Sequence, residues 1–181
     1  MKTAFLGASL AAIVGSVATA DVTYSFTNQT WAGFNFTEAY TAGGLSGTLT
    51  GATVNATLNA STNYTYADDL TVYVAGSPLA LGGALQCGGF SNLNAAQRYS
   101  WANGGSSTPG TTVTGTVNFT TGVDMTASPT LSVWIGNGYG AAGTSGNWTG
   151  SITLLGVSAV PAPGAIALVG LAGLVGRRRR S

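Results

Sequence analysis

Side chains that commonly carry enzyme chemistry are scarce in this chain. Its 181 residues include no histidine, which excludes Ser-His-Asp and Cys-His nucleophile activation, imidazole acid/base catalysis and histidine-ligated zinc. A glycosidase would need two carboxyl groups that face one bond across about 5 to 9.5 Å. Asp68 and Asp69 are neighbours, so an extended strand would point them to opposite faces. No motif unites them with Glu38 or Asp124. The sequence therefore predicts a protein that is not an enzyme.

The adjacent carboxylates of Asp68 and Asp69 have a second interpretation as a calcium site. Two carboxylates and nearby loop carbonyls could contribute to the six to eight oxygens that Ca²⁺ accepts. The alternative is that they cap a turn before Leu70 and keep the surface soluble, since the spacing matches no EF-hand loop. The pair is a weak calcium candidate, and we predict no metal or cofactor.

Three aromatic residues lie in or beside loops rich in Gly and Asn: Trp101, Tyr139 and Trp148. Exposed rings at these positions could stack on sugar faces. The alternative is that the rings close the ends of the core. Carbohydrate binding predicts at least two of the rings around one concavity, whereas a structural role predicts that they are buried or scattered. The hydroxyls of a bound sugar could then bond to three neighbouring amides, those of Asn103, Asn137 and Asn147.

The elements that would position these residues are strands, because the hydrophobic pattern has period two. Val22, Tyr24 and Phe26 fall on one face of residues 22–27, and hydroxyl residues fall on the other. Turn clusters of Gly, Asn, Ser and Pro separate the repeats. The sequence predicts an all-β, antiparallel β-sandwich of about eight to ten strands, with jelly-roll topology favoured. Helix is expected only at residues 92–98. The same alternation recurs in residues 52–60, 70–75, 111–120, 131–135 and 148–155.

Charge is concentrated at the two ends of the chain. Residues 21–160 contain one basic residue, Arg98, and five acidic residues, so they carry a net charge of −4, whereas the whole chain carries +1. A body with one cation cannot assemble the basic surface that neutralises phosphates, which excludes nucleic acid as a partner. Cys87 is the only cysteine, so we expect a small buried hydrophobic residue, with pairing between chains as the alternative.

The first 20 residues have the pattern of a secretory signal peptide. Lys2 is followed by an apolar run and then by Ala18-Thr19-Ala20, which is typical of a cleavage site. Cleavage is expected before Asp21. The sequence therefore predicts export, with a folded body at residues 21–159.

The last residues of the chain combine a short apolar run with a basic cluster. Residues 164–176 are uncharged and include four glycines, and as a helix they would reach about 20 Å against a hydrocarbon core of about 30 Å. Arginines are costly to move through a bilayer, so the cluster should stay cytoplasmic while the body lies outside. We expect a transient transmembrane stretch. The cluster consists of Arg177, Arg178, Arg179 and Arg180.

This arrangement resembles the PEP-CTERM sorting signal of bacterial exported proteins, which has a Pro-Glu-Pro-like tripeptide, an apolar stretch and a terminal basic cluster. Position 162 is Ala where the family pattern has Glu. The resemblance implies that an exosortase-type membrane transpeptidase recognises the motif, removes the tail and releases the body to the cell surface or matrix. A plain C-terminal transmembrane anchor is the alternative. The matching motif is Val160, Pro161, Ala162, Pro163 and Gly164.

Together these features predict an exported, non-enzymatic protein of the cell surface or extracellular matrix. The PEP-CTERM-like signal would occupy residues 160–181 and anchor the protein to the membrane transiently. The alternative function is a carbohydrate-binding, lectin-like module at the cell surface, with extracellular polysaccharide as its partner.

Overall fold

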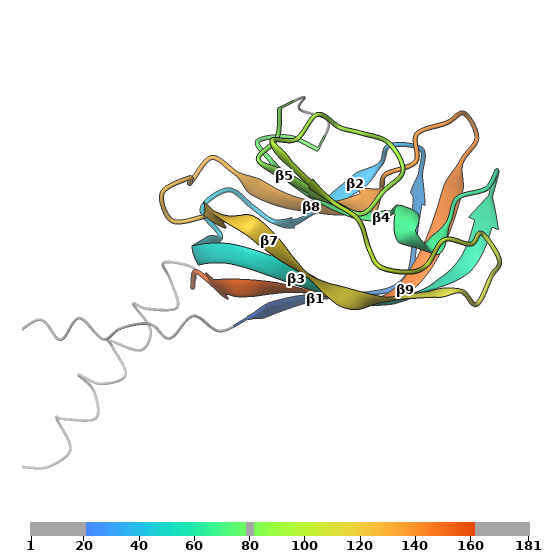
Figure 1. Ribbon diagram of the computed structural model, residues 1–181, viewed down its shortest axis with the longest axis horizontal. Helices are drawn as coiled ribbons and strands as arrows, with labels where there is room; N and C mark the ends of the chain where they lie inside the picture. The colour runs from blue at the N-terminus through green and yellow to red at the C-terminus, as the bar shows by residue number, and fades with distance from the viewer. Residues whose placement is uncertain (1–20, 79–81, 162–181) are drawn as a thin grey trace, which may run out of the picture.

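The computed structural model describes residues 21–78 and 82–161, which form two β-sheets packed face to face (Figure 1). One sheet has four strands in the order β1-β9-β3-β7, and the other has five in the order β2-β8-β4-β5-β6. All pairings are antiparallel except that of β5 with β6. This arrangement confirms the predicted all-β sandwich. The elements are β1 (Val22–Ala32), β2 (Phe36–Tyr40), β3 (Leu45–Thr62), the short 3₁₀ helix η1 (Ala67–Asp69), β4 (Leu70–Ala75), β5 (Leu85–Cys87), β6 (Gln97–Tyr99), β7 (Thr112–Asp124), β8 (Ser132–Asn137) and β9 (Ser145–Ala159).

The four-stranded sheet keeps the predicted alternation between an apolar and a hydroxyl face. On β3, Val54 and Leu58 are buried, while Thr53 and Thr57 point outward. The outward hydroxyls pair across strands, as between Thr53 and Thr116 at 2.8 Å. Such cross-strand Thr pairs stabilise a sheet without charge. Only Asp124, at the end of β7, is charged on these four strands.

Aromatic side chains fill one part of the core between the sheets. Trp31 and Trp148 are almost fully buried, and their ring centroids are 5.8 Å apart. Phe26 meets Trp31 edge to face at 5.5 Å, which is a favoured geometry for aromatic pairs. Cys87 is buried in the same core cluster and has no disulfide, as expected for a small hydrophobic residue.

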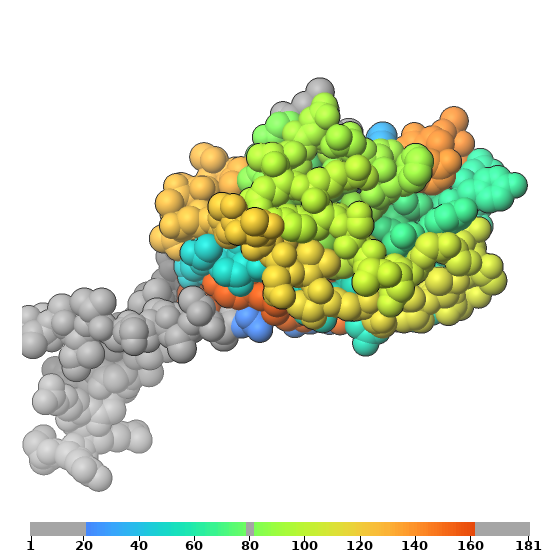
Figure 2. Space-filling model, in the orientation of Figure 1, coloured from blue at the N-terminus to red at the C-terminus, as the bar shows by residue number. Residues whose placement is uncertain are grey.

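Strand β4 is buried on both faces, which the alternation of its sequence does not indicate. Leu70 and Val72 face the core between the sheets. Tyr73 and Ala75, on the other face, pack with Leu93 from the segment between β5 and β6. That segment therefore covers part of the outer face of the five-stranded sheet, and it belongs to the green to yellow-green region at the top of Figure 2.

The beginning and the end of the described chain lie at one end of the sandwich. Val22 of β1 pairs with Leu154 of β9, and Ala159 of β9 pairs with Leu45, the first residue of β3. Within the described ranges, no helix is long and apolar enough to span a membrane. The predicted signal peptide and transmembrane stretch lie outside the described residues.

Three strands were not predicted, and the one predicted helix is wrong. β2, β5 and β6 are three to five residues long, too short for an alternating pattern to be recognised. The predicted helix at residues 92–98 is instead an irregular segment leading into β6. Asn94 there has a φ of 53°, a left-handed conformation that an α-helix does not accept.

Candidate functional site

The two tryptophans predicted to stack on sugars are in the core. Trp148 is fully buried and Trp101 is 6% exposed. Only Tyr139 of the predicted set lines a cavity. Of the two alternatives that the sequence left open, the exposed platform is therefore not formed by these three rings. The physical reason is that each indole has an internal partner and a packed environment, so each closes the core as the alternative expected.

The buried indoles hold the turn that carries the two adjacent aspartates. The indole N–H of Trp148 donates to the carbonyl of Ala67 at 3.2 Å, and that of Trp101 donates to the carbonyl of Leu70 at 2.6 Å. These bonds fix the backbone immediately before and after Asp68 and Asp69. The turn is thus positioned by residues that lie 31 and 81 positions away in the sequence.

Asp69 is buried and its carboxylate is bonded to backbone groups. Its side chain is 4% exposed. Its two oxygens accept hydrogen bonds from the N–H of Tyr66 at 2.7 Å and from the N–H of Phe90 at 3.0 Å. Burial raises the pKa of Asp69 to about 6, against the lowering effect of the Tyr66 bond. The group is therefore mainly ionised at neutral pH.

Asp68 differs from its neighbour in its surroundings. It is partly exposed, and burial raises its pKa above the ordinary value. No group of three or more His, Cys, Asp or Glu side chains occurs within residues 21–78 and 82–161 that could hold a metal ion. The two carboxylates would supply only part of the six to eight oxygens that Ca²⁺ accepts.

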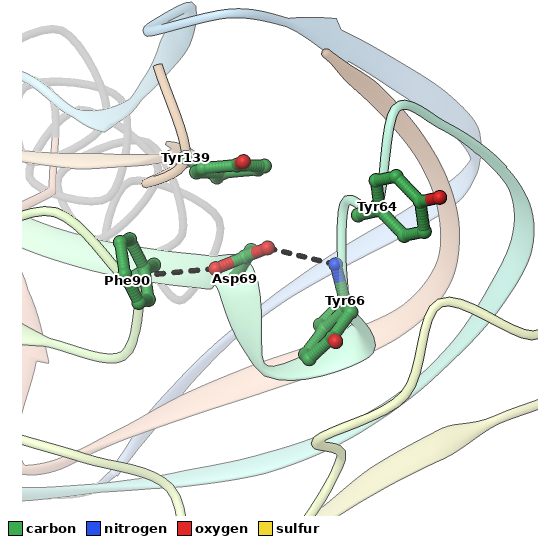
Figure 3. Close-up of a pocket in the computed structure, with 5 residues that line it drawn as sticks. All are labelled: Tyr64, Tyr66, Asp69, Phe90 and Tyr139. Atoms are coloured by element: carbon green, nitrogen blue, oxygen red, sulfur yellow. Dashed lines mark hydrogen bonds between the residues drawn. The ribbon is translucent and has the colours of Figure 1, made fainter. Parts of the chain in front are cut away.

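Four aromatic rings surround Asp69 in a cavity of about 140 Å³ (Figure 3). Tyr64 and Tyr66 come from the loop between β3 and η1, Phe90 follows β5, and Tyr139 follows β8. Tyr64 is 76% exposed and Phe90 75% exposed, so their rings present free surface around the cavity. We call these five residues the aromatic pocket.

Backbone hydrogen bonds bring the three loops of the aromatic pocket together. The N–H of Gly89 donates to the carbonyl of Asp68 at 2.9 Å, and the N–H of Gly138 donates to the carbonyl of Asp69 at 2.8 Å. Phe90 and Tyr139 also meet edge to face, with centroids 5.6 Å apart. The aromatic pocket is therefore held in place around the aspartate turn.

A second cavity, of about 380 Å³, adjoins the aromatic pocket and shares Tyr66, Asp69 and Phe90 with it. Arg98 lines this cavity, and its guanidinium donates to the carbonyls of Gly89 at 3.2 Å and Phe90 at 2.8 Å. Its other lining residues include Asp68, Ser100 and Trp101. The second cavity thus extends the aromatic pocket with polar and charged groups.

The asparagines predicted to bond sugar hydroxyls have partners within the protein. The amide of Asn103 bonds to Thr114, and that of Asn147 bonds to Thr30 and Asn59. Asn137 is fully buried; its Oδ1 accepts from the N–H of Tyr139, while its Nδ2 has no hydrogen-bond partner within the described residues. None of the three lines the aromatic pocket.

The structure does not bring the other acids to the aspartate turn. Glu38 on β2 and Asp124 on β7 are exposed, and neither lines a cavity that Asp69 lines. Glu38 and Asp124 therefore do not join Asp68 and Asp69, which lie in η1 rather than in an extended strand and both line the second cavity.

The predicted sorting motif begins immediately after the last strand. Val160 is 46% exposed and its N–H donates to the carbonyl of Gly44 at 2.9 Å. Pro161 is exposed. The remainder of the motif, Ala162, Pro163 and Gly164, and the cluster from Arg177 to Arg180 lie outside the described residues.

Comparison of the chain with protein-family models, curated proteins and solved structures finds no significant match. The site is therefore defined by its geometry. Sequence reasoning missed Tyr64, Tyr66 and Phe90. A usable signal was present, because Tyr64-Thr65-Tyr66 places two aromatic rings in a loop directly before the aspartates, and Phe90 follows two glycines.

Proposed function

We propose that this chain is an exported, non-enzymatic protein of the cell surface or extracellular matrix. The observation that supports the proposal is the position of the first and last described strands relative to the two expected cleavage sites. β1 starts at Val22, directly after the expected signal-peptide cleavage site, and β9 ends at Ala159, directly before the expected sorting motif. Asp21 and Val160 are themselves bonded to the body, through Gly156 and Gly44. Cleavage at the two expected sites would leave all nine strands that the structure describes in the remaining chain.

The proposed partner is an exosortase-type membrane transpeptidase. Val160 and Pro161 are exposed at the end of the sandwich, so an enzyme could reach the chain where the motif begins. The short apolar stretch and the arginine cluster would hold the protein at the membrane until cleavage. The protein would then be found at the cell envelope or outside the cell.

The intact mass of protein recovered from the cell exterior tests this proposal. We expect loss of residues 1–20 and of the residues beyond about Pro163. Recovery of exterior protein that still ends at Ser181 would overturn cleavable sorting and favour a plain anchor. A variant with Arg177→Ser, Arg178→Ser, Arg179→Ser and Arg180→Ser should lose membrane retention, because the costly charges that stop translocation are removed.

A second candidate function is carbohydrate binding, and the aromatic pocket supports it. Tyr64, Tyr66 and Phe90 are the exposed large aromatic rings of the pocket, and they surround a carboxylate that could accept bonds from hydroxyls. Apolar rings with a few placed polar groups are typical of small-molecule sites. Of the three rings considered in the sequence analysis, this candidate site keeps Tyr139. The other pocket rings take the place of Trp101 and Trp148. Binding of oligosaccharides to the recovered protein tests it.

We also propose that the sandwich is a jelly roll. The support is that successive strands lie in opposite sheets everywhere except along β4, β5 and β6, which share one sheet. β1, β3, β7 and β9 belong to one sheet, and β2, β4, β5, β6 and β8 belong to the other. Strands that cross from sheet to sheet in this way build the two interleaved Greek keys of that topology.

A further inference from the structure

The carboxylate of Asp69 has no cationic partner within the described residues. Arg98 is the only basic residue among them, and its guanidinium donates hydrogen bonds to the backbone carbonyls of Gly89 and Phe90. Asp69 is stabilised by two backbone N–H groups instead. A buried carboxylate is usually paired with a charge as well as hydrogen-bonded. The aromatic pocket therefore contains a buried negative charge that forms no ion pair within the described residues, and Arg98 lies in the adjoining cavity.

The rings around Asp69, like its carboxylate, favour a positively charged ligand. Aromatic faces are electrostatically negative, and they attract an ammonium group that lies within about 6 Å of the ring centre. Tyr64, Tyr66, Phe90 and Tyr139 all line the pocket with Asp69 (Figure 3). A cation in the pocket would gain both from these faces and from the carboxylate, whereas an anion would be repelled by both.

The cavity beside the aromatic pocket provides groups suited to sugar hydroxyls. It shares Asp69 with the aromatic pocket, and it adds the hydroxyl of Ser100, the carboxylate of Asp68 and the guanidinium of Arg98. These groups include both donors and acceptors. A ligand with a cationic group over Asp69 could thus continue into a region that recognises hydroxyls.

We infer that the aromatic pocket binds a saccharide through a protonated amino group, with Asp69 as its counter-charge and the rings of Tyr66 and Phe90 against its apolar faces. The ligand class is an amino sugar without an acetyl group on its nitrogen. This inference rests on the proposed carbohydrate-binding function and specifies its ligand. No covalent step is involved, because the ammonium group donates hydrogen bonds to the carboxylate.

Calorimetric titration with three oligosaccharides of equal length tests the inference. The probes are oligomers of glucosamine, N-acetylglucosamine and glucose, added to the protein recovered from the cell exterior at neutral pH. The three sugars differ mainly in the group at one carbon, which is an amine, an acetylated amine or a hydroxyl. The comparison therefore separates the effect of the ligand's charge from that of its shape. We expect glucosamine oligomers to bind at least about tenfold more tightly than the other two, as a charge-assisted bond to a buried carboxylate implies.

Variants assign the preference to named residues. Asp69→Asn should abolish the tenfold preference, because the amide carries no charge. Asp124→Asn is the matched control: its carboxylate accepts a bond from the N–H of Ala127 at the far end of β7, and it lines neither cavity. This control should leave all three affinities unchanged. Phe90→Ala should weaken all three ligands, and since this ring is 75% exposed, the fold does not depend on it.

The outcomes of the titrations distinguish failure of the amino-sugar inference from failure of the carbohydrate-binding function. Equal affinity for the three oligomers would overturn the amino-sugar inference while supporting carbohydrate binding. Binding of none of them would overturn the carbohydrate-binding function itself. If tetramethylammonium alone bound as tightly as the glucosamine oligomer, the pocket would be a site for simple organic cations, and the inference would also be wrong.

Discussion

The carboxylate of Asp69 accepts a hydrogen bond of 3.0 Å from the backbone N–H of Phe90, 21 residues further along the chain. This bond ties the turn before β4 to the loop after β5. It places an exposed aromatic ring beside a buried charge, and so it creates the central feature of the candidate site. The consequences of this arrangement can be measured in the folded protein without a ligand.

Stability should fall as pH rises through the titration of Asp69. The pKa of this group is raised from its ordinary value of 3.8 to about 6 in the folded state, so between these values the folded protein binds the proton more strongly than the unfolded chain does. Linkage then lowers the free energy of unfolding by about 2 to 3 kcal/mol across that window. Urea unfolding at a series of pH values measures the effect.

Asp69→Asn is the comparison for that experiment. The variant should show a flatter dependence on pH, with the residual slope due mainly to Asp68, whose pKa is also raised by burial. A wild-type protein that became more stable from pH 4 to pH 6 would contradict the assignment of a buried, destabilised carboxylate.

Trp148→Phe should destabilise the sandwich by about 1 to 3 kcal/mol. The substitution removes buried volume and the indole bond to the carbonyl of Ala67, and both losses are costly in a packed core. Tyr64→Phe is the control, since Tyr64 is 76% exposed and should change stability by no more than about 0.5 kcal/mol. Denaturant midpoints measure both. Equal midpoints for the two variants would mean that Trp148 is not in the core.

Gly88→Ala should cost more stability than Gly110→Ala. Both glycines have positive φ, at 81° and 90°, so alanine at either position meets backbone strain of about 1 kcal/mol. A Cβ at Gly88 would also collide with the indole of Trp101 and the carbonyl of Leu70, whereas nothing lies within 4 Å of one at Gly110. We expect a loss of about 3 kcal/mol or more at Gly88. Thermal unfolding of the two variants separates the cost of the collision from the cost of backbone strain. Similar losses of stability in both variants would contradict the close packing of Gly88 against Trp101.

Cys87 should be unreactive in the folded protein. Its side chain is fully buried and burial raises the pKa of its thiol, so little thiolate forms and reagents cannot reach it. An aromatic disulfide reagent should detect no thiol in native buffer and one per chain in denaturant. A rapid reaction in native buffer would indicate that the thiol is exposed, and it would favour the alternative of a disulfide between chains.

The sequence by itself determined the class of fold, because side chains alternate between the two faces of a strand and a buried face must be apolar. Strand β4 was predicted with its observed ends, Leu70 and Ala75. The same rule did not indicate that Tyr73 would be covered, since its partner Leu93 comes from an irregular segment. The short strands β2, β5 and β6 carry too few residues for any period to be detected.

Only the tertiary structure decided which aromatic rings face solvent. Loops have no period, so the sequence could not distinguish Trp101, which is buried, from Phe90, which is exposed. The direction of an aromatic ring is set by contacts between distant segments. The hydrogen bond from the indole of Trp148 to the carbonyl of Ala67, for example, spans 81 positions. Export remains a prediction from the two terminal segments, whereas the aromatic pocket exists only because folding brings three separate loops around Asp69.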